Sequence, residues 1–152
     1  MIVELRERRL WMLIRTKTGC LWQSVSEDGG ETWSEAEAGA IPTPGSRFFV
    51  RRLASGSLLL VNHHKFTGRS HMTARLSTDD GRAWNDGLLL DERSRVSYPG
   101  GVQGEDGRLW IVYDRERKGP GEILLAVFRE EDVAAGENVS GEVRRKRVVN
   151  AL

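Results

Sequence analysis

Short apolar runs recur along the chain at intervals of about 50 residues, separated by polar and glycine-rich turns. The clearest runs form three consecutive pairs: Leu10–Arg15 with Cys20–Ser26, Leu58–His63 with Met72–Ser77, and Leu109–Asp114 with Ile123–Phe128. Runs of six or seven residues that are bounded by Gly, Asp and Ser are typical of β-strands. The pattern therefore predicts a repeating unit of about four short strands.

A turn motif repeats with the same period. The pattern S-x-D-x-G-x-x-W occurs at Ser26, Asp28, Gly30 and Trp33, and again 51 residues later at Ser77, Asp79, Gly81 and Trp84. In such a turn the Asp carboxylate can accept backbone N–H bonds, the glycine can adopt a positive φ, and the Trp can fold back as an apolar plug between neighbouring sheets. We interpret these eight residues as structural.

Units of four antiparallel strands that repeat at this length are typical of β-propeller blades. We therefore predict an all-β domain with three four-stranded antiparallel blades, at residues 1–42, 43–92 and 93–152. Residues 129–137 are predicted to form one short helical turn, with acidic residues at its positive end. The basic stretch from Val143 to Val149 is predicted to be a half-exposed outer strand.

Charge and composition exclude several classes of partner. The 23 Lys and Arg residues nearly balance the 22 Asp and Glu residues, so electrostatics favours neither a nucleic acid nor an anionic membrane as partner. The single Cys20 cannot form an intramolecular disulfide, and the three histidines indicate neither a metal site nor a cofactor. Neither a membrane span nor a signal peptide is recognisable, so the chain as written is expected in the cytoplasm. If the chain is part of a longer protein, that parent protein could instead be exported.

The segment Ser97-Tyr98-Pro99-Gly100-Gly101 is the strongest candidate for a site. A tyrosine that directly precedes a proline and two glycines is an unusual sequence for the end of a strand with only a structural role. We interpret Tyr98 as a site residue, with a core tyrosine as the alternative. His63, His64 and His71 flank a turn at Arg69 and could line the same pocket, whereas Asp91, Glu92 and Asp114 are expected in turns or at its rim.

Together with the two turn motifs, an ordered set of segments resembles the sialidase (neuraminidase) family, whose BNR repeats carry such Asp boxes, and specifically its bacterial exo-α-sialidases. The set comprises Ile14-Arg15, Gly68-Arg69-Ser70, Ser97-Tyr98-Pro99 and Glu122-Ile123-Leu124. The resemblance implies a six-bladed propeller, of which this chain would be the C-terminal half. It implies that Tyr98 is the nucleophile and that Arg15 and Arg69 are two of the three arginines around the substrate. The family's first arginine, acid aspartate and tyrosine-paired glutamate have no counterpart, and Gly100 stands where the family commonly has aspartate.

The chemistry implied by the resemblance suits these residue types. A sialic acid carries a carboxylate on its anomeric carbon, which repels a carboxylate nucleophile but not a phenol. Arginine binds such a carboxylate through two parallel, charge-assisted hydrogen bonds. The expected function is therefore half of a retaining exo-sialidase that acts on terminal sialic acid or a related acidic sugar.

Because the acid, the glutamate and one arginine lack counterparts, the chain alone is expected to be inactive. Its expected partners are an acidic sugar and either a second copy of the chain or the missing N-terminal half of the propeller. A non-catalytic carbohydrate-binding or assembly half-propeller is one alternative. An oligomeric structural protein built from half-propellers is another.

Overall fold

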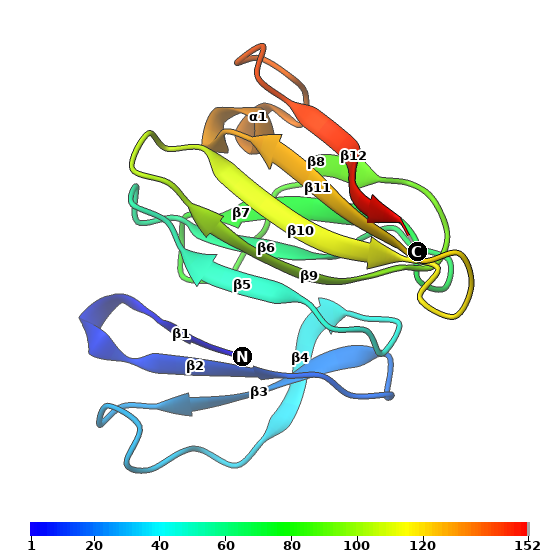
Figure 1. The fold of residues 1–152 in the computed structure, drawn as a ribbon. Helices are drawn as coiled ribbons and strands as arrows, with labels where there is room; N and C mark the ends of the chain where they lie inside the picture. Colours follow the sequence, from blue (N-terminus) through cyan, green and yellow to red (C-terminus); the bar gives the residue numbers. More distant parts are fainter. Residues whose placement is uncertain (152) are drawn as a thin grey trace.

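Residues 1–151 are described by a computed structural model, in which twelve β-strands form three four-stranded antiparallel sheets. Each sheet is made of four strands that follow one another along the chain (Figure 1). The prediction of an all-β fold with three such sheets is confirmed.

The strands follow the chain in three groups of four. The first sheet contains β1 (Ile2–Glu4), β2 (Leu10–Ile14), β3 (Cys20–Ser26) and β4 (Glu37–Pro42). The second contains β5 (Phe49–Arg52), β6 (Leu58–His63), β7 (Met72–Ser77) and β8 (Leu88–Asp91). The third contains β9 (Val96–Gln103), β10 (Leu109–Arg115), β11 (Glu122–Phe128) and β12 (Arg144–Ala151). One 3₁₀ turn, η1 (Arg6–Arg8), precedes β2, and one helix, α1 (Glu130–Ala135), precedes β12.

The second sheet lies between the other two, and apolar side chains fill both interfaces. Trp11, Leu13 and Leu21 of the first sheet pack in one cluster with Val50 and Leu60 of the second. A separate cluster joins side chains of β6 to β8 with those of β10 and β11. All six residues of β6 are consequently buried, whereas buried and less buried positions alternate along β2, as expected for a strand with one covered face.

The first strands of the three sheets, β1, β5 and β9, lie next to one another, with β5 in the middle (Figure 1). β5 and β9 also run in the same direction (Figure 1). The connections β6–β7 and β10–β11 therefore lie at the same end of the stack, together with the crossover from β8 to β9. The two S-x-D-x-G-x-x-W turns connect β3 to β4 and β7 to β8 at the opposite end.

The two turns share three hydrogen bonds. Ser26 Oγ donates to Asp28 Oδ1 over 2.7 Å and accepts from the Gly30 amide over 2.8 Å, while the indole of Trp33 donates to the Gly30 carbonyl over 3.1 Å. The second turn repeats this arrangement through Ser77, Asp79, Gly81 and Trp84, at 2.8, 2.8 and 3.1 Å. The glycines have φ values of +102° and +85°, which a residue with a Cβ rarely adopts.

The two tryptophans differ in their packing, which departs from the expectation that both would lie between sheets. Trp84 packs against the cluster between the first and second sheets, whereas Trp33 belongs to neither cluster and is half-buried. The reason is positional, because among residues 1–151 only one side of the first sheet is covered by another sheet.

The C-terminal part contains the predicted helix and outer strand. The carboxylate of Asp132, which is fully buried, accepts hydrogen bonds from the amides of Arg129 and Ser140, both over 2.8 Å. Gly136 ends α1 with a φ of 77°, the left-handed conformation typical of a helix C-terminus. The edge strand of the third sheet, β12, is exposed along nearly all of its length. No helix within residues 1–151 has both the length and the apolar character that crossing a membrane requires.

Candidate functional site

A groove with a volume of about 830 Å³ opens where the second and third sheets meet. Its twelve lining residues come from the β6–β7 connection, the β8–β9 crossover, the beginning of β9, the end of β10 and the β10–β11 connection. Backbone hydrogen bonds hold these segments together: the amide of Val96 donates to the Arg69 carbonyl and that of Glu116 to the Arg95 carbonyl, both over 3.2 Å. The groove is therefore formed by three loops anchored to one another.

An irregularity in β9 positions Tyr98 at the edge of this groove. Ser97 pairs with Asp114 and Gly100 pairs with Val112, so Tyr98 and Pro99 together stand opposite the single residue Tyr113. Two residues opposite one define a β-bulge, which redirects side chains and tolerates a proline that has no N–H to donate. Tyr98 adopts a φ of 57°, a conformation that costs free energy for a residue other than glycine.

Two arginines from distant segments contact Tyr98. The Nη1 atom of Arg15, which directly follows β2, donates a hydrogen bond to the Tyr98 hydroxyl over 3.3 Å. The guanidinium carbon of Arg117 lies 3.7 Å from the centroid of the Tyr98 ring, in a cation–π contact. Arg117 and then Arg15 favour the phenolate and lower the pKa of Tyr98 from about 10 to about 8.

Asp114 supports this arrangement from the end of β10. Its Oδ2 atom forms an ion pair with Nε of Arg117 at 3.0 Å, while its Oδ1 atom is buried without a hydrogen-bond partner. Burial raises the pKa of Asp114, and the pairing with Arg117 opposes that effect. Asp114 therefore holds the arginine that covers the Tyr98 ring.

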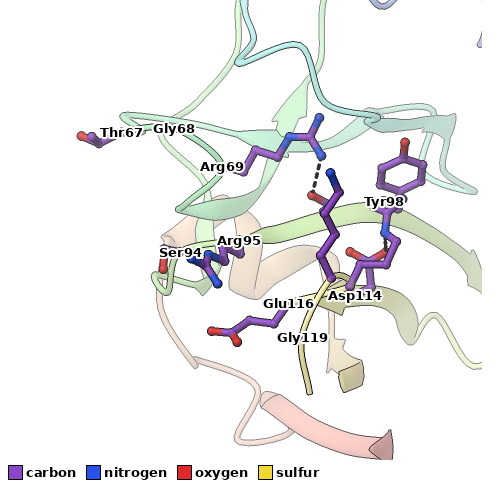
Figure 2. A pocket seen from close by; sticks show the side chains of 12 residues that line it. Thr67, Gly68, Arg69, Ser94, Arg95, Tyr98, Asp114, Glu116 and Gly119 are labelled. Carbon is purple, nitrogen blue, oxygen red and sulfur yellow. Dashed lines mark hydrogen bonds and ion pairs between the residues drawn. The ribbon is translucent and has the colours of Figure 1, made fainter. Parts of the chain in front are cut away.

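Arg69 lies in the same groove as Tyr98. Its Nη1 atom donates to Ser97 Oγ over 3.4 Å, next to the bulge. Figure 2 shows Tyr98 on one side of the groove and Arg95 on the other, with the side chain of Arg69 reaching between them. The structure thus brings together Arg15, Arg69 and Tyr98, the three residues that sequence reasoning selected.

Other residues considered from the sequence have different surroundings. Glu122 pairs with Arg115 at 3.1 Å and with Arg93 at 3.5 Å, outside the lining of the groove. His63 is buried with Nδ1 2.8 Å from the Ser70 carbonyl, and burial lowers its pKa. Within residues 1–151, no group of three or more His, Cys, Asp or Glu side chains is arranged to hold a metal ion.

Sequence reasoning missed Arg117 and gave Asp114 only a place at the rim. Arg117 belongs to the run Arg115-Glu116-Arg117-Lys118, which reads as an ordinary charged hairpin turn. The one available signal was the spacing of three residues between Asp114 and Arg117 at the end of an apolar strand. That spacing allows an ion pair but does not indicate an aromatic partner.

Consecutive four-stranded sheets, two equivalent turns closed by Asp hydrogen bonds and a groove with polar residues at the strand ends define a protein of the β-propeller repeat type. Residues 1–111 match the family described as BNR repeat-like domain, and the chain belongs to that family. A search of the curated proteins finds no match.

Among solved structures, the chain is similar to Hadza microbial sialidase Hz136, with a TM-score of 0.59 and 15% sequence identity. The superposition covers 85% of this chain and 30% of that sialidase, so the chain spans less than a third of that protein's length. The similarity shows that the three sheets correspond to part of a sialidase propeller.

Proposed function

We propose that this chain is the C-terminal, tyrosine-bearing part of a retaining exo-α-sialidase-like glycosidase that acts on a terminal sialic acid or a related acidic sugar. The observation that carries the proposal is the hydrogen bond between Arg15 and Tyr98, 83 residues apart in sequence, where Tyr98 lines a groove that Arg69 also lines. Tyrosine and arginine suit a sugar whose anomeric carbon bears a carboxylate.

In this proposal, Arg15 and Arg69 bind the substrate carboxylate and Tyr98 attacks the anomeric carbon. The bond to the leaving oxygen breaks as the bond from the Tyr98 oxygen forms, and water later cleaves the glycosyl–tyrosine bond. A phenol with a pKa of about 8 is partly ionised near neutral pH, which favours the attack. The Arg117 contact supports the same role, because a cation over the ring stabilises the phenolate.

A second candidate function is a non-catalytic carbohydrate-binding module. Within the part of the chain that the structure describes, the hydrogen-bond partner of the Tyr98 hydroxyl is Arg15, and no carboxylate bonds to it. A retaining sialidase also needs an acid for the leaving oxygen. A groove that lacks both the base for Tyr98 and the acid for the leaving oxygen would bind an acidic sugar without cleaving it.

Two measurements on the purified chain test the proposal. Ligand-detected NMR should show binding of sialic acid that is lost in Arg69→Ala, while the exposed-strand variant Arg144→Ala retains it. Hydrolysis of a fluorogenic sialoside by the chain alone should lie well below the turnover of order 1 s⁻¹ of a working enzyme, because each missing acid or base contributes roughly 10²–10⁴-fold.

The outcomes separate the candidates. Sialic acid binding together with slow turnover that disappears in Tyr98→Phe supports the proposal that the chain is part of a glycosidase. Binding with no turnover attributable to Tyr98 supports the binding module. Absence of any sialic acid binding contradicts both.

A further inference from the structure

A second cavity, with a volume of about 450 Å³, lies between the first and second sheets. We call it the intersheet cavity. The first sheet contributes residues of β2, β3 and β4 to its lining, and the second sheet contributes Arg75 of β7 and part of the second Asp-box turn. No residue lines both this cavity and the groove that holds Tyr98. The volume falls in the range of pockets that bind small ligands.

An irregularity in the edge strand β4 leaves this space open. Three residues of β4 stand opposite the single residue Leu21 of β3, which defines a bulge. Two of the three, Gly39 and Ala40, line the cavity and have little or no side chain. Gly39 has no room for a larger one, since an added Cβ would lie 2.8 Å from the Leu21 carbonyl oxygen. The bulged strand therefore does not fill the space beside the second sheet.

Two tryptophans give the cavity an apolar wall. The ring of Trp11 lies against Gly81, where an added Cβ would come within 2.5 Å of it. The indole of Trp84 donates to the carbonyl of the same glycine over 3.1 Å, and that of Trp11 donates to Gln23 over 3.1 Å. Because both indole N–H groups are already bonded, the two rings offer apolar surface, which Leu13 and other aliphatic residues of the first sheet extend.

Arg75 places a cation beside this wall. It stands opposite Leu60, whose side chain belongs to the cluster between the first and second sheets, so Arg75 is turned toward the first sheet. Its Nε atom donates to the Asn85 carbonyl over 2.8 Å. Within residues 1–151, neither Nη atom of Arg75 donates a hydrogen bond, and no carboxylate oxygen lies within 4.0 Å of its guanidinium.

The acidic neighbours of Arg75 are already paired. Burial lowers the pKa of Arg75, and the charge of Asp86 opposes that effect from a distance. The Oδ1 atom of Asp86 lies 2.9 Å from Nζ of Lys65 and 3.3 Å from Nε2 of His64. Asp80, the acidic residue of the lining, forms an ion pair with an arginine of β5 at 2.7 Å. The guanidinium of Arg75 is therefore available to an anion from outside the chain.

These features define the chemistry of a ligand. An arginine without a carboxylate partner can bind a carboxylate through two parallel, charge-assisted hydrogen bonds. Arg9 and Arg82 also line the cavity, so its net charge attracts an anion. The indole and aliphatic surface favours an apolar body, because its burial removes apolar area from water. A sugar would leave hydroxyl groups opposite side chains that cannot bond to them.

We propose that the intersheet cavity binds an organic monocarboxylate with an apolar body, either aliphatic or aromatic. The carboxylate pairs with Arg75, and the body packs beside Trp11 and Trp84. This site is separate from the groove that holds Tyr98, and the inference does not rest on the proposed function.

The test compares acids with their uncharged counterparts. Purified chain is titrated with hexanoate, hydrocinnamate, the two corresponding alcohols and acetate, and NMR follows the indole N–H signals, assigned from Trp11→Phe and Trp84→Phe. The tighter-binding acid should shift both signals. It should bind at least about tenfold more tightly than its alcohol, since hydrogen bonds to charged groups contribute enough for that factor. Acetate, which lacks the apolar body, should bind at least about tenfold more weakly than that acid. Hexanoate and hydrocinnamate together show which body is preferred.

Two arginine variants locate the carboxylate. Arg75→Gln should remove the preference for the acid over its alcohol, whereas Arg75→Lys should keep part of it because the positive charge remains. The matched control is Arg69→Gln, which removes the same charge from the other groove and should leave the affinity for the acid within about twofold. The comparison of acid and alcohol in the unaltered chain needs no variant, so it decides the proposal even if Arg75→Gln does not fold.

The remaining outcomes contradict the proposal. Equal affinity for the acid and its alcohol overturns it, and so does a preference that survives in Arg75→Gln. Acid binding that is lost in Arg69→Gln would assign the carboxylate to the groove that holds Tyr98. If neither acid shifts the indole signals, the intersheet cavity is not a ligand site. None of these results changes the test of sialic acid binding, which depends on Arg69 and Tyr98.

Discussion

Two cationic neighbours lower the pKa of the Tyr98 hydroxyl. These two cations are far apart in the sequence, since Arg15 follows β2 and Arg117 follows β10. The other tyrosine, Tyr113, is buried and donates to Asp91 over 3.1 Å. Burial, followed by the charge of Asp91, raises the pKa of Tyr113. The two phenols are therefore shifted in opposite directions.

This difference makes Tyr98 observable by itself, because the chain contains only two tyrosines. Ultraviolet difference spectra should show one phenol that ionises with a pKa of about 8, before Tyr113. The sign follows from the two cations, which favour the phenolate and so lower its pKa. Arg117→Met should return this transition toward the ordinary value of about 10.

The control for the titration is Tyr98→Phe, which should remove the first transition and leave that of Tyr113. The exposed-residue variant Arg144→Met should leave both unchanged. If Arg117→Met leaves the first transition at its original pH, the cation–π contact does not influence the phenol.

At the scale of the element, β9 has two adjacent glycines with different surroundings. A Cβ at Gly100 would meet no atom within 4 Å, whereas a Cβ at Gly101 would lie 2.3 Å from the Trp110 carbonyl oxygen. Gly101 is thus required for the approach of β9 to β10 just after the bulge. Gly100, where the resembling family commonly has aspartate, has room for a side chain.

We predict that Gly101→Ala lowers the free energy of unfolding by about 2 kcal/mol or more, because the added atom would overlap the backbone. Gly100→Asp should change it by less than about 0.5 kcal/mol, because a Cβ there meets no atom within 4 Å. Urea denaturation of the two variants checks this. Equal losses would show that the bulge does not constrain the two positions differently.

The two Asp-box tryptophans offer a second comparison between equivalent elements. Trp84 contacts the cluster between the first and second sheets, and Trp33 contributes to neither cluster. Trp84→Ala should therefore lower the free energy of unfolding by about 2 kcal/mol, roughly half the loss for a fully buried tryptophan. Trp33→Ala should lower the free energy of unfolding by less than about 1 kcal/mol.

Thermal and urea unfolding of the two tryptophan variants would measure the difference. A loss for Trp33→Ala as large as that for Trp84→Ala would mean that an additional surface covers Trp33 in solution. Such a result would also locate that surface on the first sheet.

At the scale of the whole molecule, the stack of three sheets presents an uncovered apolar face on the third sheet. Val102 and Val112 are 52% and 43% exposed, and Val102 pairs directly with Trp110. Apolar patches of this kind in soluble proteins mark contact surfaces. A sheet of a larger propeller or a second copy of the chain would bury this face.

We predict that the purified chain associates in a concentration-dependent manner. Val102→Lys should weaken this association by at least about tenfold, since it places a charge in the apolar contact. The control is Val139→Lys, because Val139 is 54% exposed but lies in the loop before β12. Sedimentation at several concentrations checks the prediction, and a chain that stays monomeric throughout contradicts it.

Local sequence signals determined most of the elements. The six apolar runs predicted strands whose observed bounds differ by at most one residue, and the acidic stretch before Gly136 predicted α1. These features are local, since side-chain alternation and turn chemistry act between residues close in sequence. The 51-residue period of the turns also predicted three similar sheets.

The candidate site was predictable only in part. Arg15, Arg69 and Tyr98 follow from their motifs and the family resemblance, whereas no pattern indicated that Arg117 would cover the Tyr98 ring. That contact depends on the β-bulge opposite Tyr113 and on the path of the β10–β11 connection. Both result from packing between segments, which short-range periodicity does not encode.

The sequence by itself thus determined the strands, the turns, two of the residues that line the groove and the arginine that bonds to one of them. Tertiary structure alone decided that Arg75 lines a cavity between two sheets, and that Trp84 packs between sheets while Trp33 does not. The physical reason is the same in each case. Hydrogen bonds and alternation act over a few residues, but burial and charge compensation depend on which distant surfaces meet.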